Sequence, residues 1–222
     1  MMKIKEIYSF LKDISKHNDR EWFAANKERY QAVKAEVEEL TRQLISRVAV
    51  EDPRAAMLSV ADCTYRIYRD TRFSQDKTPY KTHIGIFVNP PFGKKGDTAG
   101  YYLHLEPGST AFYVGSYCLP PDKLRVLRGE IYANIDEYLE IVDDPAFRAL
   151  YPVVGDDPLK TAPKGFPKDW PYIDYLKPRH FGVNALLPDD FLDKNGVDGL
   201  IPYIEQGARY NRFCNFTLDP ED

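Results

Sequence analysis

The chain has 222 residues, of which 43% are apolar and 14% aromatic, and this is enough material for a hydrophobic core. Its formal net charge of −4 argues against a protein that coats duplex nucleic acid or an anionic membrane, because such partners select an excess of Lys and Arg. Three widely spaced cysteines, no signal-peptide core and no apolar run of the ~18 residues that a membrane span requires predict a soluble, cytoplasmic protein.

The N-terminal part has the pattern of two helices. Apolar residues recur at helical spacing in the first, at Ile4, Ile7, Leu11 and Ile14. Asn18, with Glu21 three residues later, resembles a capping box and predicts the start of a second, long helix that continues to about residue 48. Pro53 then closes this helical region.

Beyond residue 63 the apolar period changes to two, which is typical of strands. The pattern predicts strands at 64–69, 83–88, 101–106 and 111–118. The Gly- and Pro-rich connection at 89–100 is predicted to be mobile and could cover a site as a lid.

The C-terminal half is mostly helical. Two short helices are expected between 124 and 141, a proline-rich irregular stretch at 151–180 with a turn of helix near its end, a strand at 180–187 and a helix at about 198–212. No repeat or linker divides the chain. We therefore expect one α+β domain over residues 1–222, with N-terminal helices, a central and mainly antiparallel sheet, and further helices toward the C-terminus.

Residues 65–83, YRIYRDTRFSQDKTPYKTH, concentrate positive charge in this otherwise acidic chain. The stretch holds five cations and two carboxylates, a net charge of +3, so the remainder of the chain carries −7. Arg offers a planar fork for phosphate or carboxylate, Lys a point charge and Tyr a hydroxyl donor. The candidate ligand-binding residues are therefore Arg66, Arg69, Arg72, Lys77, Tyr80 and Lys81.

The same residues allow a second interpretation. Asp70 and Asp76 are candidate structural partners for the arginines, and carboxylates elsewhere in the chain could pair with the remaining cations. We thus carry two hypotheses. The first is a basic, aromatic-edged pocket that binds a small phosphorylated or carboxylated ligand, with or without catalysis, and the alternative is a non-enzymatic protein-interaction module in which the motif is an ion-pair lattice.

The charged stretch also resembles a known motif. R-I-Y-R-D-T-R-F-S-Q-D-K-T-P-Y is similar to R-x-x-R-D-x-R-F-x-x-[DN]-K-x-x-Y, found in a bacterial and fungal family of conserved hypothetical proteins, a domain of unknown function. FLKDISKHNDREWFAANKERY, YYLHLEPG and PKGF add to the resemblance. It implies membership of a family, and no activity, cofactor or partner comes with it.

Other chemistry has weaker support in the sequence. His104 and Glu106 share a face of their predicted strand, and with His83 they form a weak alternative metal site, although no His-x-His or HExxH spacing supports it. We expect no metal on this basis. No residue pattern identifies a catalytic residue or a cofactor, and the sequence names no protein partner.

Overall fold

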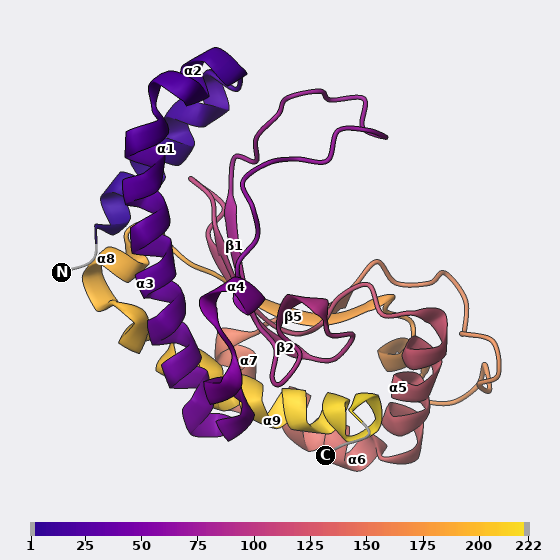
Figure 1. Cartoon of the computed structure of the whole chain (residues 1–222). Coiled ribbons are helices and arrows are strands. Elements are labelled where there is room, and N and C mark those ends of the chain that lie inside the picture. The colour runs from indigo at the N-terminus through magenta and orange to yellow at the C-terminus, as the bar shows by residue number, and fades with distance from the viewer. Residues whose placement is uncertain (1–2, 220–222) are drawn as a thin grey trace. The chain divides into compact units, whose positions relative to one another are not determined.

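The computed structural model describes residues 3–219 (Figure 1). Its longer helices are α1 (Ile4–Lys16), α3 (Lys27–Glu51), α5 (Pro121–Ala133), α6 (Ile135–Val142) and α9 (Ile201–Leu218). Shorter α-helices are α2 (Arg20–Ala25), α4 (Val60–Cys63), α7 (Pro145–Leu150) and α8 (Phe191–Asn195). Single 3₁₀ turns are η1 (Pro53–Met57), η2 (Gly93–Lys95), η3 (Ile173–Leu176) and η4 (Val197–Leu200).

Five strands form one antiparallel sheet with the order β1-β2-β3-β5-β4. They are β1 (Ile84–Val88), β2 (Gly100–Leu105), β3 (Ala111–Ser116), β4 (Val154–Asp156) and β5 (His180–Leu186). Helices precede and follow the sheet in the chain, so the α+β prediction is confirmed.

The chain forms two compact units. The first holds the described part of Met1–Lys94 with Tyr102–Phe112 and Leu186–Ile201, and the second holds Lys95–Tyr101, Tyr113–Ala185 and the described residues from Pro202 onward. Whether they fold as one domain, as the sequence suggests, stays a prediction.

In the first unit the apolar stripes of α1 and α3 pack together. Ile7, Leu11 and Ile14 of α1 are fully buried, and the Phe10 ring lies 5.8 Å from that of Tyr30 on α3. The Tyr8 and Thr110 hydroxyls share a hydrogen bond of 2.6 Å, which joins α1 to the end of the turn between β2 and β3. The apolar residues at helical spacing thus lie between α1 and α3 and hold the two helices together.

The charged segment does not form the strand predicted at 64–69. Between α4 and β1 the chain makes only isolated bridges, Thr64 with Ile86 and Tyr68 with Tyr80 (Figure 1, purple loop). The Arg69 N–H donates to the Pro79 carbonyl at 2.9 Å and the Lys81 N–H donates to Ile67 at 2.8 Å. Pro79 has no N–H to extend this ladder, so the result is a narrow hairpin stem.

Asn18 holds this stem in place. Its amide group donates to the Tyr80 carbonyl at 2.9 Å and accepts from the Tyr80 N–H at 3.0 Å, while the Phe23 and Tyr80 rings stack at 4.1 Å. The predicted capping box at Asn18 is therefore wrong. Asp19 caps α2 instead, because its carboxylate accepts from the Trp22 N–H at 2.8 Å.

Two further expectations need correction. The long second helix is interrupted at Asn26, whose backbone, at φ −104° and ψ 18°, leaves the helical conformation. Its N–H, at 3.0 Å, and its side chain, at 2.9 Å, both donate to the Trp22 carbonyl. The beginning of the 89–100 connection is packed, since Asn89 is fully buried and Gly93, at a φ of +62°, lies against the Asp62 backbone. A side chain at Gly93 would collide with that backbone, so this segment is a structural element.

The second unit uses asparagine amides in a similar way. The Asn215 side chain on α9 accepts from the Ala99 N–H at 2.7 Å and donates to the Ala99 carbonyl at 3.0 Å, and Asn211 donates to the Gly100 carbonyl at 3.2 Å. Both asparagines are buried. They satisfy backbone groups at the start of β2 that would otherwise be costly to bury.

Several short elements were not predicted from the sequence, namely α4, α7, α8, β4, η1 and η2. The turn of helix before residue 180, the strand at 180–187 and the C-terminal helix are present as η3, β5 and α9. Across residues 3–219, no helix combines the length and the apolar composition needed to cross a bilayer.

The Asn18 contact yields a first prediction. Asn18→Ala removes two hydrogen bonds and leaves both polar backbone groups of Tyr80 without a partner, so we expect a loss of about 2 kcal/mol in the free energy of unfolding. Asn134→Ala, which removes an exposed bond to Glu130, should cost no more than about 0.5 kcal/mol. Urea denaturation measures both, and equal costs would show that Asn18 does not anchor the hairpin.

Candidate functional site

Most charges of the motif find partners inside the hairpin. Arg72 pairs with Asp70 at 2.6 Å, and both side chains are largely exposed. The Arg69 guanidinium bonds Asp76 and the Thr78 hydroxyl. Both carboxylates of the motif are thus used within the hairpin, while the structural lattice of the alternative hypothesis stays a prediction.

Two further candidate ligand residues are occupied elsewhere in the hairpin. The Lys77 ammonium donates to the Thr71 carbonyl at 2.9 Å and so closes the loop at the hairpin tip. Tyr80 is 4% exposed, with its ring stacked on Phe23. Neither Lys77 nor Tyr80 lines the cavity beside the hairpin that is described below.

Arg66 and Lys81 remain. Within residues 3–219, neither side chain makes a hydrogen bond or an ion pair, and Lys81 instead lies 5.3 Å from the centre of the Tyr65 ring. Burial, followed by the neighbouring Arg66 charge, lowers the pKa of Lys81. Arg66 and Lys81 are thus close enough to repel each other, and Arg66 also acts on Asp70, whose pKa is lowered first by its bonds with Arg72 and then by the Arg66 charge.

Both residues line a cavity of about 500 Å³ in the first unit. Helix α3 forms one wall, α4 and the chain after it form another, and the residues around the start of β1 complete it. Its apolar surface comes from Val33, Val37, Ile67 and Ile84, and its aromatic edge from Tyr30 and Tyr65. The volume lies within the roughly 300–1,000 Å³ of small-molecule sites.

Two more lysines reach this cavity from outside the motif. Lys94 donates to the Thr64 carbonyl at 2.8 Å and also to the Ala61 carbonyl, so its position is fixed. Lys34 pairs with Glu38 at 3.4 Å across one turn of α3. Four cations and one carboxylate therefore border the cavity. No spacing in the sequence pointed to Lys34 or Lys94, because both come from other elements.

A second group of polar side chains meets beside the cavity. The His104 Nε2 lies 3.0 Å from the Glu106 Oε2, and the His83 and His104 rings are 4.8 Å apart. The ligand atoms of all three residues lie within 4.8 Å of one another. Burial, and then the neighbouring His104, lowers the pKa of His83. His83 itself lines the cavity.

Cys63 precedes the charged segment, where nearby cations could activate a thiol. It is fully buried, and burial raises its pKa to about 12. A thiol with this pKa is protonated near neutral pH, so Cys63 is a core residue.

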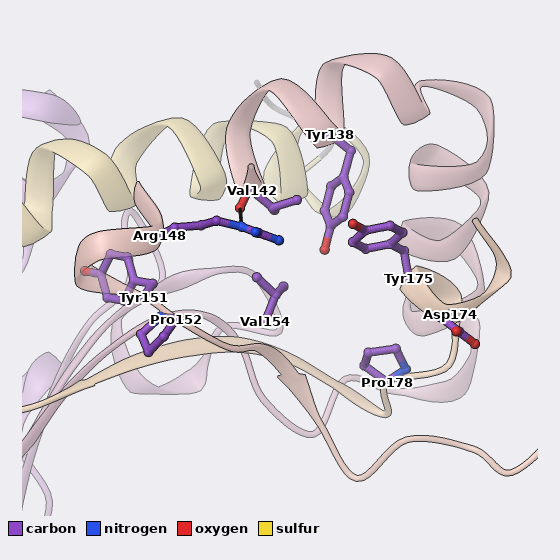
Figure 2. A pocket seen from close by; sticks show the side chains of 9 residues that line it. All are labelled: Tyr138, Val142, Arg148, Tyr151, Pro152, Val154, Asp174, Tyr175 and Pro178. Carbon is purple, nitrogen blue, oxygen red and sulfur yellow. Dashed lines mark hydrogen bonds between the residues drawn. The ribbon is translucent and has the colours of Figure 1, made fainter. Parts of the chain in front are cut away.

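A separate, smaller cavity of about 210 Å³ lies in the second unit (Figure 2). The Tyr138 and Tyr175 rings meet edge to face at 5.8 Å on one side of it. Its one cation, Arg148, is paired with Asp143 at 2.8 Å and donates to the Val142 carbonyl at 3.2 Å, the bond drawn in Figure 2. This cavity is too small and its charge too well paired to compete with the first as a ligand site.

The hairpin ion pairs yield a second prediction. The Thr78 N–H, the Arg69 guanidinium and the Thr78 hydroxyl hold the pKa of Asp76 at about 2, below the ~3.9 of an unfolded chain. A lowered folded-state pKa stabilises the protein above pH ~4, and this stabilisation is lost as the pH falls toward 2. Asp76→Asn should therefore destabilise the protein at pH 7, with a penalty that shrinks steadily below pH 4. A penalty that is independent of pH in urea titrations between pH 7 and 3 would contradict the assignment.

Comparison with known proteins adds one finding to this geometry. No curated protein and no solved structure matches the chain. Residues 6–213 match a protein family described as Conserved hypothetical protein (DUF2461), which covers nearly all of the chain. This agrees with the resemblance carried by the charged motif, and the chain belongs to that family.

Proposed function

We propose that the first unit binds a small organic anion, a phosphate or carboxylate ester or acid, in the cavity beside the charged hairpin. One observation carries the proposal: Arg66 and Lys81 line a 500 Å³ cavity, and neither makes a hydrogen bond or an ion pair within residues 3–219. Lys81 is half-buried and, among the described residues, has no hydrogen-bond or ion-pair partner, which is a cost that a bound anion would relieve. Arg66 is exposed and would add its charge to the same anion from the cavity lining.

The lining of the cavity suggests the rest of the ligand. Inorganic phosphate alone would leave most of the volume unfilled, whereas an apolar or ring-shaped group could contact Val33, Val37 and the Tyr65 ring. Arg66 supplies a bidentate fork and Lys81 a mobile point charge for the anionic end. Lys94 is held by two carbonyls and adds fixed positive potential nearby.

A thermal-shift screen tests this proposal. Inorganic phosphate, pyrophosphate, nucleoside monophosphates and citrate are added to protein that has been stripped of metal and dialysed, because a ligand of the native state must raise the melting temperature. For the strongest of these probes, Arg66→Met and Lys81→Met should each weaken the affinity about 10-fold or more, as expected for the loss of a charge-assisted hydrogen bond.

Matched controls come from the same hairpin. Lys77→Met and Arg72→Met each remove one positive charge, as the cavity variants do, but the Lys77 ammonium bonds the Thr71 carbonyl and the Arg72 guanidinium pairs with Asp70. Both variants should therefore leave the affinity for the probe within about twofold of the wild-type value. If no oxyanion raises the melting temperature, or if Lys77→Met weakens binding as much as Lys81→Met does, the cavity is not the anion site.

One observation favours the alternative, a non-enzymatic interaction module. Phe73 is 96% exposed near the hairpin tip, with the Arg72 guanidinium 5.8 Å from its ring. An exposed aromatic and arginine pair is typical of residues that anchor protein interfaces. Phe73→Ser should leave oxyanion binding unchanged, so its effects on any partner can be separated from those of the cavity variants.

A further inference from the structure

The strongest unassigned feature is the group of His83, His104 and Glu106. His104 lies in β2 and Glu106 directly after it, so strand alternation puts both side chains on one face together with Tyr102. His83 directly precedes the neighbouring strand β1, and its ring lies 4.8 Å from that of His104. Residues from two adjacent strands thus bring two imidazoles and one carboxylate to a single point.

The geometry points to a binding site for one divalent transition-metal ion, of the zinc or iron(II) class, held by His83, His104 and Glu106. Ligand atoms bound at about 2.0–2.2 Å from one ion lie roughly 3–3.5 Å from each other. The His104 Nε2 and Glu106 Oε2 are already 3.0 Å apart, and the whole set lies within 4.8 Å. A rotation of the His83 side chain would complete the set.

Outer partners orient both of the closely spaced ligands. The Tyr102 hydroxyl lies 3.1 Å from the His104 Nδ1, which leaves Nε2 directed toward Glu106. The Thr82 hydroxyl donates to the other carboxylate oxygen, Oε1, at 3.3 Å. Metal-binding histidines and carboxylates commonly have such partners, which fix the ring and the carboxylate before the ion arrives.

Gly85 is part of the same arrangement. A Cβ atom at this position would lie 2.4 Å from the Tyr102 hydroxyl oxygen, so only glycine leaves the space that the tyrosine occupies in this orientation. The absent side chain on β1 thereby leaves room for Tyr102 of β2 to contact His104, two residues further along the same strand.

Two imidazoles and one carboxylate suit zinc and non-haem iron(II), which keep open coordination positions at such sites. Because His83 also lines the cavity, the ion would lie at its edge and could share an anionic ligand with Arg66 and Lys81. The metal site itself rests only on the three ligands, so it stands or fails independently of the proposed anion binding. The nearby cations Lys81 and Arg69 oppose a further positive charge, so we expect the affinity to increase when either of them is neutralised.

The test is a titration of the full chain, freed of any affinity tag and stripped of metal, with Co²⁺ in a buffer without phosphate or carboxylate. We expect one Co²⁺ per chain with a visible absorption band, displaced by Zn²⁺. His83→Ala, His104→Ala and Glu106→Gln should each weaken the affinity at least about 10-fold, and Tyr102→Phe should weaken it about 10-fold through the loss of an outer partner.

Controls separate this site from adventitious binding. His17 and His180 are the two histidines outside the group, and His17→Ala and His180→Ala should leave both stoichiometry and affinity unchanged. Tyr102→Phe keeps the ring and so guards against loss of binding through unfolding, and circular dichroism of each variant checks its fold. Absence of stoichiometric Co²⁺ binding, or full binding by folded Glu106→Gln, would overturn the inference. Oxyanion binding by the stripped protein is measured separately and does not depend on this result.

Discussion

The charge balance within residues 65–83 is the constraint on which the candidate site in the first unit depends. Two carboxylates cannot neutralise five cations, and in the hairpin Asp76 pairs with Arg69 and Asp70 with Arg72. Lys77 is satisfied by a backbone carbonyl. The remaining positive charge, on Arg66 and Lys81, lies where the hairpin stem meets the cavity. The motif thus holds ion pairs in one part and two cations beside a cavity in another, which are the observations from which the two hypotheses start.

Regular elements were predictable wherever packing follows a simple period. Strands β2 and β5 alternate between buried and half-buried positions over much of their length, whereas β1 and β3 have buried residues on both faces. The β-branched and aromatic residues of all four were sufficient to predict them. The stretch at 64–69 also alternates, yet it carries charges on both faces and Pro79 limits its partner, so it forms only a bridge. Asn26 shows a related limit, because its backbone leaves the helical conformation at a point that the apolar stripe continues across.

The candidate site was only partly predictable, because it is built by tertiary contacts. The sequence located the charged segment, but it could not tell which cations the two aspartates would take, or that Lys34 and Lys94 would join from α3 and η2. Alternation correctly put His104 and Glu106 on one face. Bringing His83 beside them requires the register of two strands, with Tyr102 packed over Gly85, and this register is not visible in a residue pattern.

The central claim is that Arg66 and Lys81 form an anion site. The most direct measurement is a crystal structure of the protein soaked in selenate, an oxyanion of phosphate-like shape whose position is revealed by anomalous scattering. The account predicts a selenate ion in the cavity, with oxygens about 2.7–3.0 Å from the Arg66 guanidinium and the Lys81 ammonium. A cavity without selenate, in a crystal where selenate occupies other surface sites and Arg66 is paired with a carboxylate, would contradict it.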